Sequence, residues 1–232
     1  MKRPIKVTLI LLIIGSLSLN GFERVDSSID EIDENDICFD GFINGHEYID
    51  LGLPSGTLWA TCNVGAYKPE STGALFAWGE TIDDKEAYNW VTYKHSVGYY
   101  DITLKKYCSK PSCGYNGYSD SFTTLLPWDD AATVNWGNGW RTPTRYEWQE
   151  LVDNTSSTMT TRNGVKVLQF TAANGKKLFL PGYVLYGYWQ GNYWSSTLST
   201  YDPYRAFNYS VYDQSVGGSD RCRQGLVRPV RY

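Results

Sequence analysis

The sequence predicts an α+β domain built from many short strands and two helices. Composition is the first reason, because 22 glycines and 9 prolines in 232 residues favour strands and turns over a helical bundle. The second reason is that turn signals recur every few residues from residue 48 onward and separate apolar runs too short for helices. The third is that helix signals gather in residues 127–154, with strand-like segments on both sides.

Residues 1–22 have the form of a secretory signal. Lys2, Arg3 and Lys6 precede an uncharged run from 7 to 19, which is the order of charge and apolarity that export signals use. The run is too short for a permanent membrane helix, which needs about 20 residues. We therefore expect an exported protein, at the cell surface, in the periplasm or outside the cell, with no membrane span after leader cleavage.

An acidic linker is expected over residues 23–41, followed by one domain over 42–232. Residues 23–40 carry eight acids and one base, which is typical of a solvated spacer. Residues 41–232 carry 17 acidic and 17 basic side chains. A neutral domain without a basic stripe excludes nucleic acid as the expected partner.

The expected strands are short and bounded by turns. Residues 83–126 are polar, tyrosine-rich and aperiodic, which indicates a long surface insertion. An Asn174-Gly175 pair predicts a hairpin between two of the strands. The strands are expected at 57–61, 74–78, 165–170, 177–180, 193–196, 206–211 and 226–230.

Two helices are expected between residues 127 and 154. The first begins at Pro127, has acids in its first turn and ends by Gly137. The second begins after Thr144, which forms a capping box with Glu147, and ends at Asn154. Apolar residues at three- and four-residue spacing give the second helix one buried face.

The five cysteines indicate disulfide chemistry in an exported chain. Cys108 and Cys113 are the expected local pair, because they would close a short loop. Pairing of Cys62 with Cys222 is left open. Zinc is the alternative for the local pair, but it would need two further ligands, and His46 and His95 are the only histidines.

Three separated motifs go beyond a generic α+β domain. Residues 50–65 read DLGLPSGTLWATCNVG. Residues 129–148 contain DDAA, NWG, WRTPT and EW in that order, and YWSS at 193–196 is followed by VRPV at 227–230. Together these motifs resemble the Fibrobacter succinogenes major paralogous domain, over about residues 42–231. The resemblance implies a C-type-lectin-like fold of the formylglycine-generating-enzyme type. The chain lacks the cysteine of a lipoprotein signal.

Most motif residues are expected to have structural roles. Large aromatic side chains more often fill the core than contact a ligand. Arg141 and Arg228 are expected to hydrogen-bond backbone carbonyls, because a loop-rich fold leaves many acceptors outside its ladders. The tryptophans expected in the core are Trp59, Trp78, Trp136, Trp140, Trp148 and Trp194.

We expect no catalytic residues, no cofactor and no catalytic metal. Two histidines cannot complete a three-histidine iron site, and no nucleophile elbow, phosphate loop or dinucleotide fingerprint is present in the sequence. The calcium-dependent sugar motif of C-type lectins is also absent from the sequence. A structural calcium ion is left open, with ligands unknown.

The segment 183–212 indicates a binding surface. Eleven of its 30 residues are aromatic and two are charged, and tyrosine mixed with Ser, Gly and Asn is the composition of binding loops. Its loops are expected at 186–191 and 198–204. The alternative is that these tyrosines pack over an irregular sheet. The expected ligand-binding residues are Trp189, Tyr201, Tyr204, Arg205, Asn208, Tyr212, Asp213, Asp220, Arg221 and Arg223.

The function expected from these patterns is non-catalytic binding of a glycan or a protein through aromatic C-terminal loops. One alternative is a structural or adhesin subunit of a surface assembly, and a more remote one is an oxidase or hydrolase on the same fold. Lectin-like domains of this kind are targets of diversity-generating retroelements, which mutate adenines in a C-terminal stretch. The composition of residues 186–223 fits such a target, but an undiversified paralogue would have the same composition.

Overall fold

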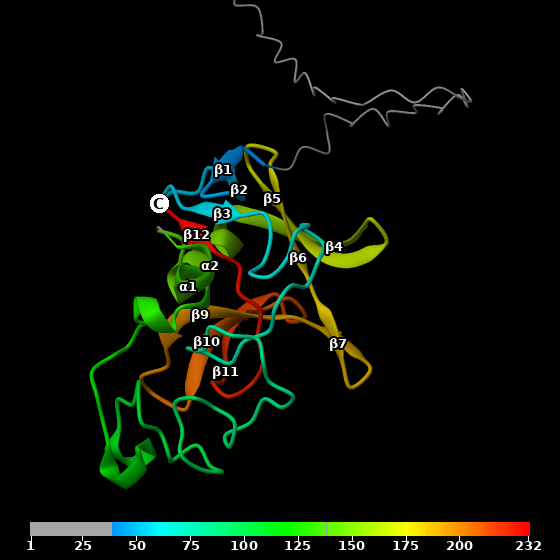
Figure 1. The fold of residues 1–232 in the computed structure, drawn as a ribbon. Helices are drawn as coiled ribbons and strands as arrows, with labels where there is room; N and C mark the ends of the chain where they lie inside the picture. Colours follow the sequence, from blue (N-terminus) through cyan, green and yellow to red (C-terminus); the bar gives the residue numbers. More distant parts are fainter. Residues whose placement is uncertain (1–38, 138) are drawn as a thin grey trace, which may run out of the picture. The chain divides into compact units, whose positions relative to one another are not determined.

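The computed structural model describes residues 39–137 and 139–232, so the predicted leader and nearly all of the acidic linker lie outside the described residues. Every helix and strand described here lies in one compact unit, from Ile37 to Tyr232. These residues form two α-helices and four small antiparallel sheets (Figure 1). The predicted α+β class is confirmed. No helix among the described residues is both long and apolar enough to span a membrane.

The first sheet joins residues from distant parts of the chain. It has the order β1-β2-β3-β12. Val230 of β12 stands opposite Trp59 of β3, so a segment near residue 230 completes a sheet begun near residue 41. Its strands are β1 (Gly41–Ile43), β2 (His46–Asp50), β3 (Leu58–Ala60) and β12 (Val230–Arg231).

Three further sheets follow α2 along the chain. One has the order β4-β5-β6, one has the order β11-β10-β9, and β7 pairs with β8 as a hairpin. The predicted Asn174-Gly175 turn connects β5 to β6, and Gly175 has the positive φ of +81° that such a turn requires. The strands are β4 (Thr155–Arg162), β5 (Val165–Ala172), β6 (Lys177–Pro181), β7 (Tyr183–Leu185), β8 (Tyr188–Gln190), β9 (Asn192–Leu198), β10 (Arg205–Ser210) and β11 (Ser215–Asp220).

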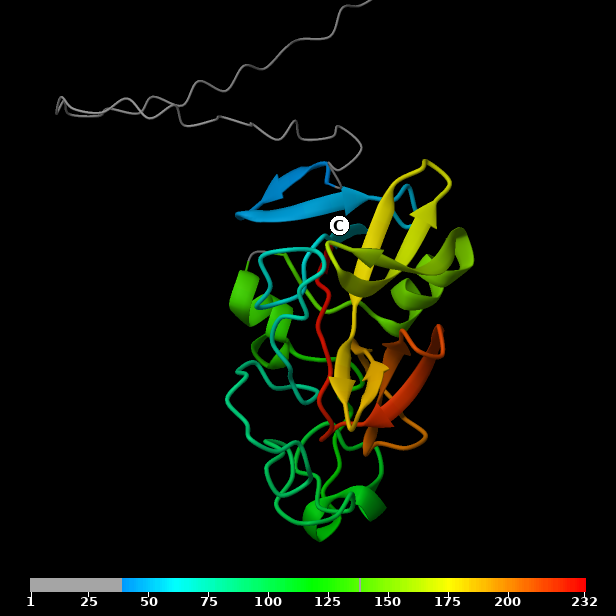
Figure 2. The same ribbon diagram turned by 90° about the vertical axis from the view of Figure 1, so that its right-hand side faces the viewer.

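The second helix, α2 (Arg145–Asn154), matches the sequence prediction at both ends. Its capping box is present: the Thr144 hydroxyl accepts from the Glu147 N–H, and the Glu147 carboxylate accepts from the Thr144 N–H at 2.7 Å. Trp148 packs against Trp59 at 4.7 Å between ring centroids and lies almost parallel to Tyr209. The helix therefore lies between the first sheet and the β9–β11 sheet, in the largest core cluster (Figures 1 and 2).

The first helix begins later than predicted. Residues Pro127–Asp129 form a 3₁₀ turn, and α1 covers Ala131–Trp136. The reason is the side chain of Asp130, which caps α1 and also accepts from the Thr142 N–H and hydroxyl. A residue held in the extended N-cap conformation ends the 3₁₀ turn and starts a new helix.

The expected core tryptophans are buried with one exception. Five of the six are almost fully buried, whereas Trp136 is half-buried. Arg228 binds backbone carbonyls as predicted, including those of Ala60 and Phe179. Arg141 also donates to a backbone carbonyl, that of Thr142 at 3.5 Å, but its main partner is Glu147, with which its guanidinium forms a bidentate ion pair at 2.8 and 2.5 Å.

The predicted disulfide is not formed in the structure. All four described cysteines are free thiols. The Cys108 thiol instead donates to the carbonyl of Lys110, at 3.1 Å, within the loop that the disulfide would have closed. Burial raises the pKa of the Cys108 thiol, so it stays protonated near neutral pH.

Candidate functional site

The aromatic segment 183–212 is divided between core and surface. Tyr193, Trp194 and Tyr209 are buried, so they are scaffold residues. Four other tyrosines of the segment are mostly exposed to solvent: Tyr186, Tyr188, Tyr201 and Tyr212. We expected a loop at 186–191, but this segment contains strand β8. Only Tyr186 and Gly187 form a turn, which connects β7 to β8.

Five of the ten predicted ligand residues lie at one end of the β9–β11 sheet. We call Tyr201, Tyr204, Arg205, Asp220 and Arg223 the loop-end group. Arg205 and Asp220 stand opposite each other across β10 and β11, with 3.9 Å between guanidinium Nε and carboxylate Oδ1. Tyr201 and Tyr204 belong to the β9–β10 loop, and Arg223 follows β11. Each of the five is at least partly exposed.

Two further predicted residues, Tyr212 and Asp213, lie at the other end of the same hairpin. They form the turn after Ser210, which pairs with Ser215, whereas Arg205 pairs with Asp220 at the loop end. Five residue steps along a strand cover roughly 17 Å. The ten residues therefore do not form one continuous patch.

The predictions for Asn208 and Arg221 are wrong. Both side chains are buried: Asn208 donates to the Asn192 side-chain oxygen at 2.9 Å, and Arg221 binds two backbone carbonyls. Trp189 is half-buried against Gly182, where an added Cβ would meet the indole at 2.6 Å. The Lys166 ammonium lies 4.5 Å from the centre of the Trp189 ring, so the indole also has a partner within the protein.

The insertion 83–126 contributes residues to the loop end that sequence reasoning missed. The Lys110 ammonium lies 4.6 Å above the ring of Tyr201 and also donates to its backbone carbonyl. Ser109 donates to the carbonyl of Thr200 at 3.1 Å. The charge of Asp202 raises the pKa of Tyr204, and Asp101 of the insertion adds to this effect. The tyrosine-rich composition of the insertion was a signal in the sequence that it could join a binding surface. Its contact with residues 200–204 could not be predicted from the sequence.

The insertion also carries its own exposed aromatic and apolar side chains. It has little regular structure apart from the 3₁₀ turns Pro111–Cys113 and Tyr115–Gly117, and Figure 2 shows it on the side away from β1 and β2. Exposed side chains here enlarge the apolar surface available near the loop-end group. They are Val91, Val97, Tyr99, Tyr100, Ile102, Tyr115, Tyr118 and Phe122.

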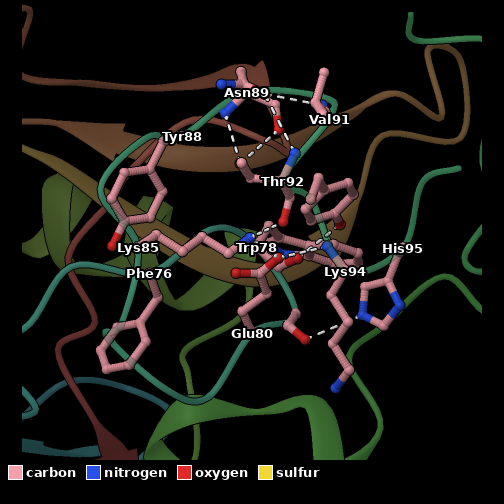
Figure 3. A network of polar contacts seen from close by, with 12 residues as sticks. Phe76, Trp78, Glu80, Lys85, Tyr88, Asn89, Val91, Thr92, Lys94 and His95 are labelled. Carbon is pink, nitrogen blue, oxygen red and sulfur yellow. Dashed lines mark hydrogen bonds and ion pairs between the residues drawn. The ribbon is translucent and has the colours of Figure 1, made fainter. Parts of the chain in front are cut away.

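Buried charges fix the start of the insertion to the body. Glu80 is buried, and one of its carboxylate oxygens accepts from the Lys85 ammonium at 2.6 Å and from the Lys94 N–H at 2.7 Å. Figure 3 shows these three residues together, with the His95 imidazole beside them. The His95 ring lies 3.1 Å from the carbonyl of Gly79. A buried carboxylate with its hydrogen bonds satisfied holds the surrounding loop in one conformation.

Asp129 is a second buried carboxylate, and its hydrogen bonds hold the middle of the insertion against the body. It is 1% exposed and accepts from Lys94 at 2.8 Å, from Tyr107 at 2.7 Å and from Lys106. Burial alone would raise the pKa of Asp129, but these hydrogen bonds outweigh it and lower the pKa to about 2. Burial lowers the pKa of His95, 3.8 Å away, to about 4.

Arg221 connects this network to the loop end. Its guanidinium donates to the carbonyls of Tyr107 and Lys106, and lies over the rings of Trp78 and Tyr93 at 5.4 and 5.5 Å. Asp220, at the loop end, is its neighbour in sequence. The buried Arg221 therefore anchors the insertion beside the exposed Asp220 and Arg223.

The network around Asp129 is suited to structural support. Asp129, His95 and Tyr107 are groups that acid–base chemistry uses, but the cavity beside Asp129 has a volume of about 10 Å³. That space holds about one water molecule and no substrate. Within the described ranges, no three His, Cys, Asp or Glu side chains are grouped as a metal would require. No ligand for the calcium ion left open by the sequence can therefore be named.

No family model, curated protein or solved structure matches this chain.

Proposed function

We propose that the chain is a non-catalytic, exported binding module with a lectin-like fold, and that the loop-end group contacts its ligand. The observation that carries the proposal is the placement of Tyr201, 79% exposed, on a loop that Lys110 supports and that leads into Arg205, opposite Asp220. Tyrosine and arginine together supply rigid contact area and directed hydrogen bonds, which is the composition of interface centres.

The scaffold beneath the loop end supports this proposal. A binding loop that is already ordered loses less conformational entropy when its ligand binds. Buried ion pairs at Glu80 and Asp129 and the buried Arg221 hold the insertion in place. The β10–β11 pairing holds Arg205 against Asp220.

A protein ligand fits these residues better than a glycan. The loop-end group carries two cations and one anion on an exposed surface, with additional tyrosines on the adjoining insertion. Protein interfaces are enriched in tyrosine and arginine. A glycan would rely on stacking against Tyr201 or Tyr204, since we propose no calcium-dependent sugar site.

Binding by the full chain to a protein array and a glycan array tests the proposal. We expect Tyr201→Ala to weaken binding to the selected ligand at least about tenfold, as truncation of an interface hot spot does. Tyr146→Ala is the matched control, because Tyr146 is 72% exposed on α2 and outside the loop-end group. Equal losses in both variants, or a ligand unaffected by Tyr201→Ala, would refute the assignment. A chain that binds only copies of itself would favour the structural-subunit alternative.

We also propose that residues 186–223 are a target of retroelement-directed diversification. Its support is compositional, since exposed Tyr, Asp and Ser residues alternate with buried scaffold residues in this stretch. Sequencing the DNA that flanks the gene tests it. The proposal requires a reverse-transcriptase gene and an adenine-rich near-copy of this segment nearby, and it fails without them.

A further inference from the structure

A cavity of about 520 Å³ lies between the β1–β2 hairpin, the loop 62–67, the start of the insertion and α1. This volume is within the range of small-molecule sites. None of the loop-end residues lines it. His46, Glu47 and Cys62 line one side, and Asp83 and Trp136 line another.

Aromatic and apolar side chains form much of the cavity wall. Phe42 is 61% exposed and Tyr67 is 98% exposed, although both are large apolar groups that a soluble domain more often covers. Trp136 is stacked on His46 with 3.7 Å between ring centroids and 5° between ring planes. This stacking holds the indole in a fixed orientation at the cavity wall.

The charged residues that line the cavity are acidic. Glu47 and Asp83 are its two carboxylates, and no lysine or arginine is among the described residues that line it. The Thr61 hydroxyl donates to Glu47 at 2.9 Å, and the Leu75 N–H and Tyr88 hydroxyl donate to Asp83 at 3.1 and 3.0 Å. The protein therefore holds both carboxylates in place, and neither has a lysine or arginine ion-pair partner among the described residues.

One arginine, Arg228, lies behind the wall near Cys62 and is fully buried. Its guanidinium donates to Asn63 and to three backbone carbonyls, so its hydrogen-bonding groups are directed away from the cavity. Its charge acts on the neighbouring Cys62, where burial nevertheless raises the pKa of the thiol. The cavity surface therefore combines two carboxylates with aromatic rings.

We propose that this cavity binds a small organic cation, an ammonium group on an apolar stem, through Glu47, Asp83 and the aromatic walls. Aromatic rings attract a cation through their quadrupole, most strongly when it is a poorly hydrated alkylammonium. The two carboxylates supply the compensating charge. An anionic ligand would be repelled by the same two groups.

A neutral sugar is the competing ligand for an aromatic cavity with carboxylates. Sugar hydroxyls need a dense set of both donors and acceptors, whereas the donors of this cavity are partly used within the protein. The Asn135 amide, for example, donates to the carbonyls of Thr81 and Ala131. The cavity lining has two acidic side chains and, among the described residues, no lysine or arginine. This charge favours an organic cation over a neutral sugar.

Cys62 provides a reporter inside the cavity. We would measure alkylation of each cysteine of the purified full chain by iodoacetamide at pH 8.5, with and without choline as the probe. Choline should slow alkylation of Cys62, which lines the cavity, and leave Cys113 unchanged, because Cys113 lies outside it. The neutral isostere 3,3-dimethylbutan-1-ol should need at least about tenfold higher concentration for the same protection, because it lacks the charge.

Two variants test the role of charge. Glu47→Gln retains an acceptor for the Thr61 hydroxyl and should weaken choline protection about tenfold, whereas Glu86→Gln, exposed and outside the cavity, should not change it. Thermal unfolding of each variant checks that the fold is intact. Equal protection by choline and its isostere, protection only by methyl glucoside, or no protection of Cys62 would each overturn the proposal.

Discussion

Replacing Asp129 by asparagine tests whether charge holds the insertion on the body. The carboxylate is almost fully buried and accepts from Lys94, Lys106 and Tyr107. The asparagine side chain has nearly the same shape but no charge and one acceptor oxygen fewer, so the change removes the electrostatic attraction with little change in packing volume. The Lys94 side chain, which is already half exposed, can then turn toward solvent.

The magnitude follows from the pKa of Asp129. Its ordinary value is 3.8 and the folded state lowers it to about 2. A difference of this size corresponds to about 2 kcal/mol of stability at neutral pH. Because the side chain of Asp129 is only 2% exposed, solvent screening does not reduce this figure much.

The pH dependence gives the sharper test. A carboxyl group whose folded pKa is depressed stabilises the fold above its unfolded pKa, and this contribution is lost as pH falls through the folded pKa. The loss caused by Asp129→Asn should therefore be about 2 kcal/mol at pH 7 and below about 1 kcal/mol near pH 2.5.

His95 adds a further pH dependence that is coupled to Asp129, because the charge of Asp129 raises the pKa of His95 against the effect of burial. Its pKa is lowered from 6.5 to about 4, so stability falls as pH drops from 6.5 toward 4, because the unfolded chain binds the proton first. The contribution is roughly 3 kcal/mol. Comparing Asp129 with Asp129→Asn in a His95→Gln background removes it, which subtraction alone does not, because the charge of Asp129 raises the pKa of His95.

Urea unfolding followed by tryptophan fluorescence measures both quantities. Asp84→Asn, an exposed residue of the insertion, is the control and should change stability by less than about 0.5 kcal/mol. An Asp129→Asn variant as stable as wild type at pH 7 would refute the reasoning. So would a loss of the same size at pH 7 and pH 2.5.

Three further predictions concern the scaffold. Replacing Thr144 by Ala removes the capping box of α2 and should cost about 1 kcal/mol in urea unfolding, and an unchanged midpoint would count against the cap. Gly65 and Gly56 both have positive φ, but an added Cβ would meet Ala74, at 2.8 Å, only at Gly65. Gly65→Ala should therefore destabilise the protein by at least about 1 kcal/mol more than Gly56→Ala does. Equal effects of the two changes would show that the contact relaxes freely. A fragment of residues 39–232 should unfold cooperatively in circular dichroism, and a broad transition would place the domain boundary elsewhere.

Local features of the fold could be predicted from the sequence because their determinants are close together. The capping box of α2 spans four residues, and the Asn174-Gly175 turn spans two. Among the strands that were missed, β4 is polar and lies at a sheet edge, and β11 contains two glycines. Their strand conformation comes from pairing with neighbours and not from their own propensity.

The candidate site was less predictable because exposure depends on distant partners. Arg221 and Arg223 are two residues apart, and the sequence gives both the same character. Arg221 is buried because carbonyls of residues 106 and 107 accept its guanidinium, whereas Arg223 is exposed. No local pattern distinguishes them. The contact of Lys110 with Tyr201 could not be predicted either, because the two residues are far apart in the sequence.

The pairing of β12 with β3 has a consequence for when this domain can fold. Arg228 binds Asn63 across 165 residues of chain, and Val230 pairs with Trp59 in the first sheet. Contacts this distant require the entropic cost of closing a long loop before they contribute any stability, which slows folding. A chain emerging from the ribosome therefore cannot complete this sheet until residues near 230 have been made. For a protein that we propose to be exported, such a delay keeps the chain unfolded and able to pass a secretion channel.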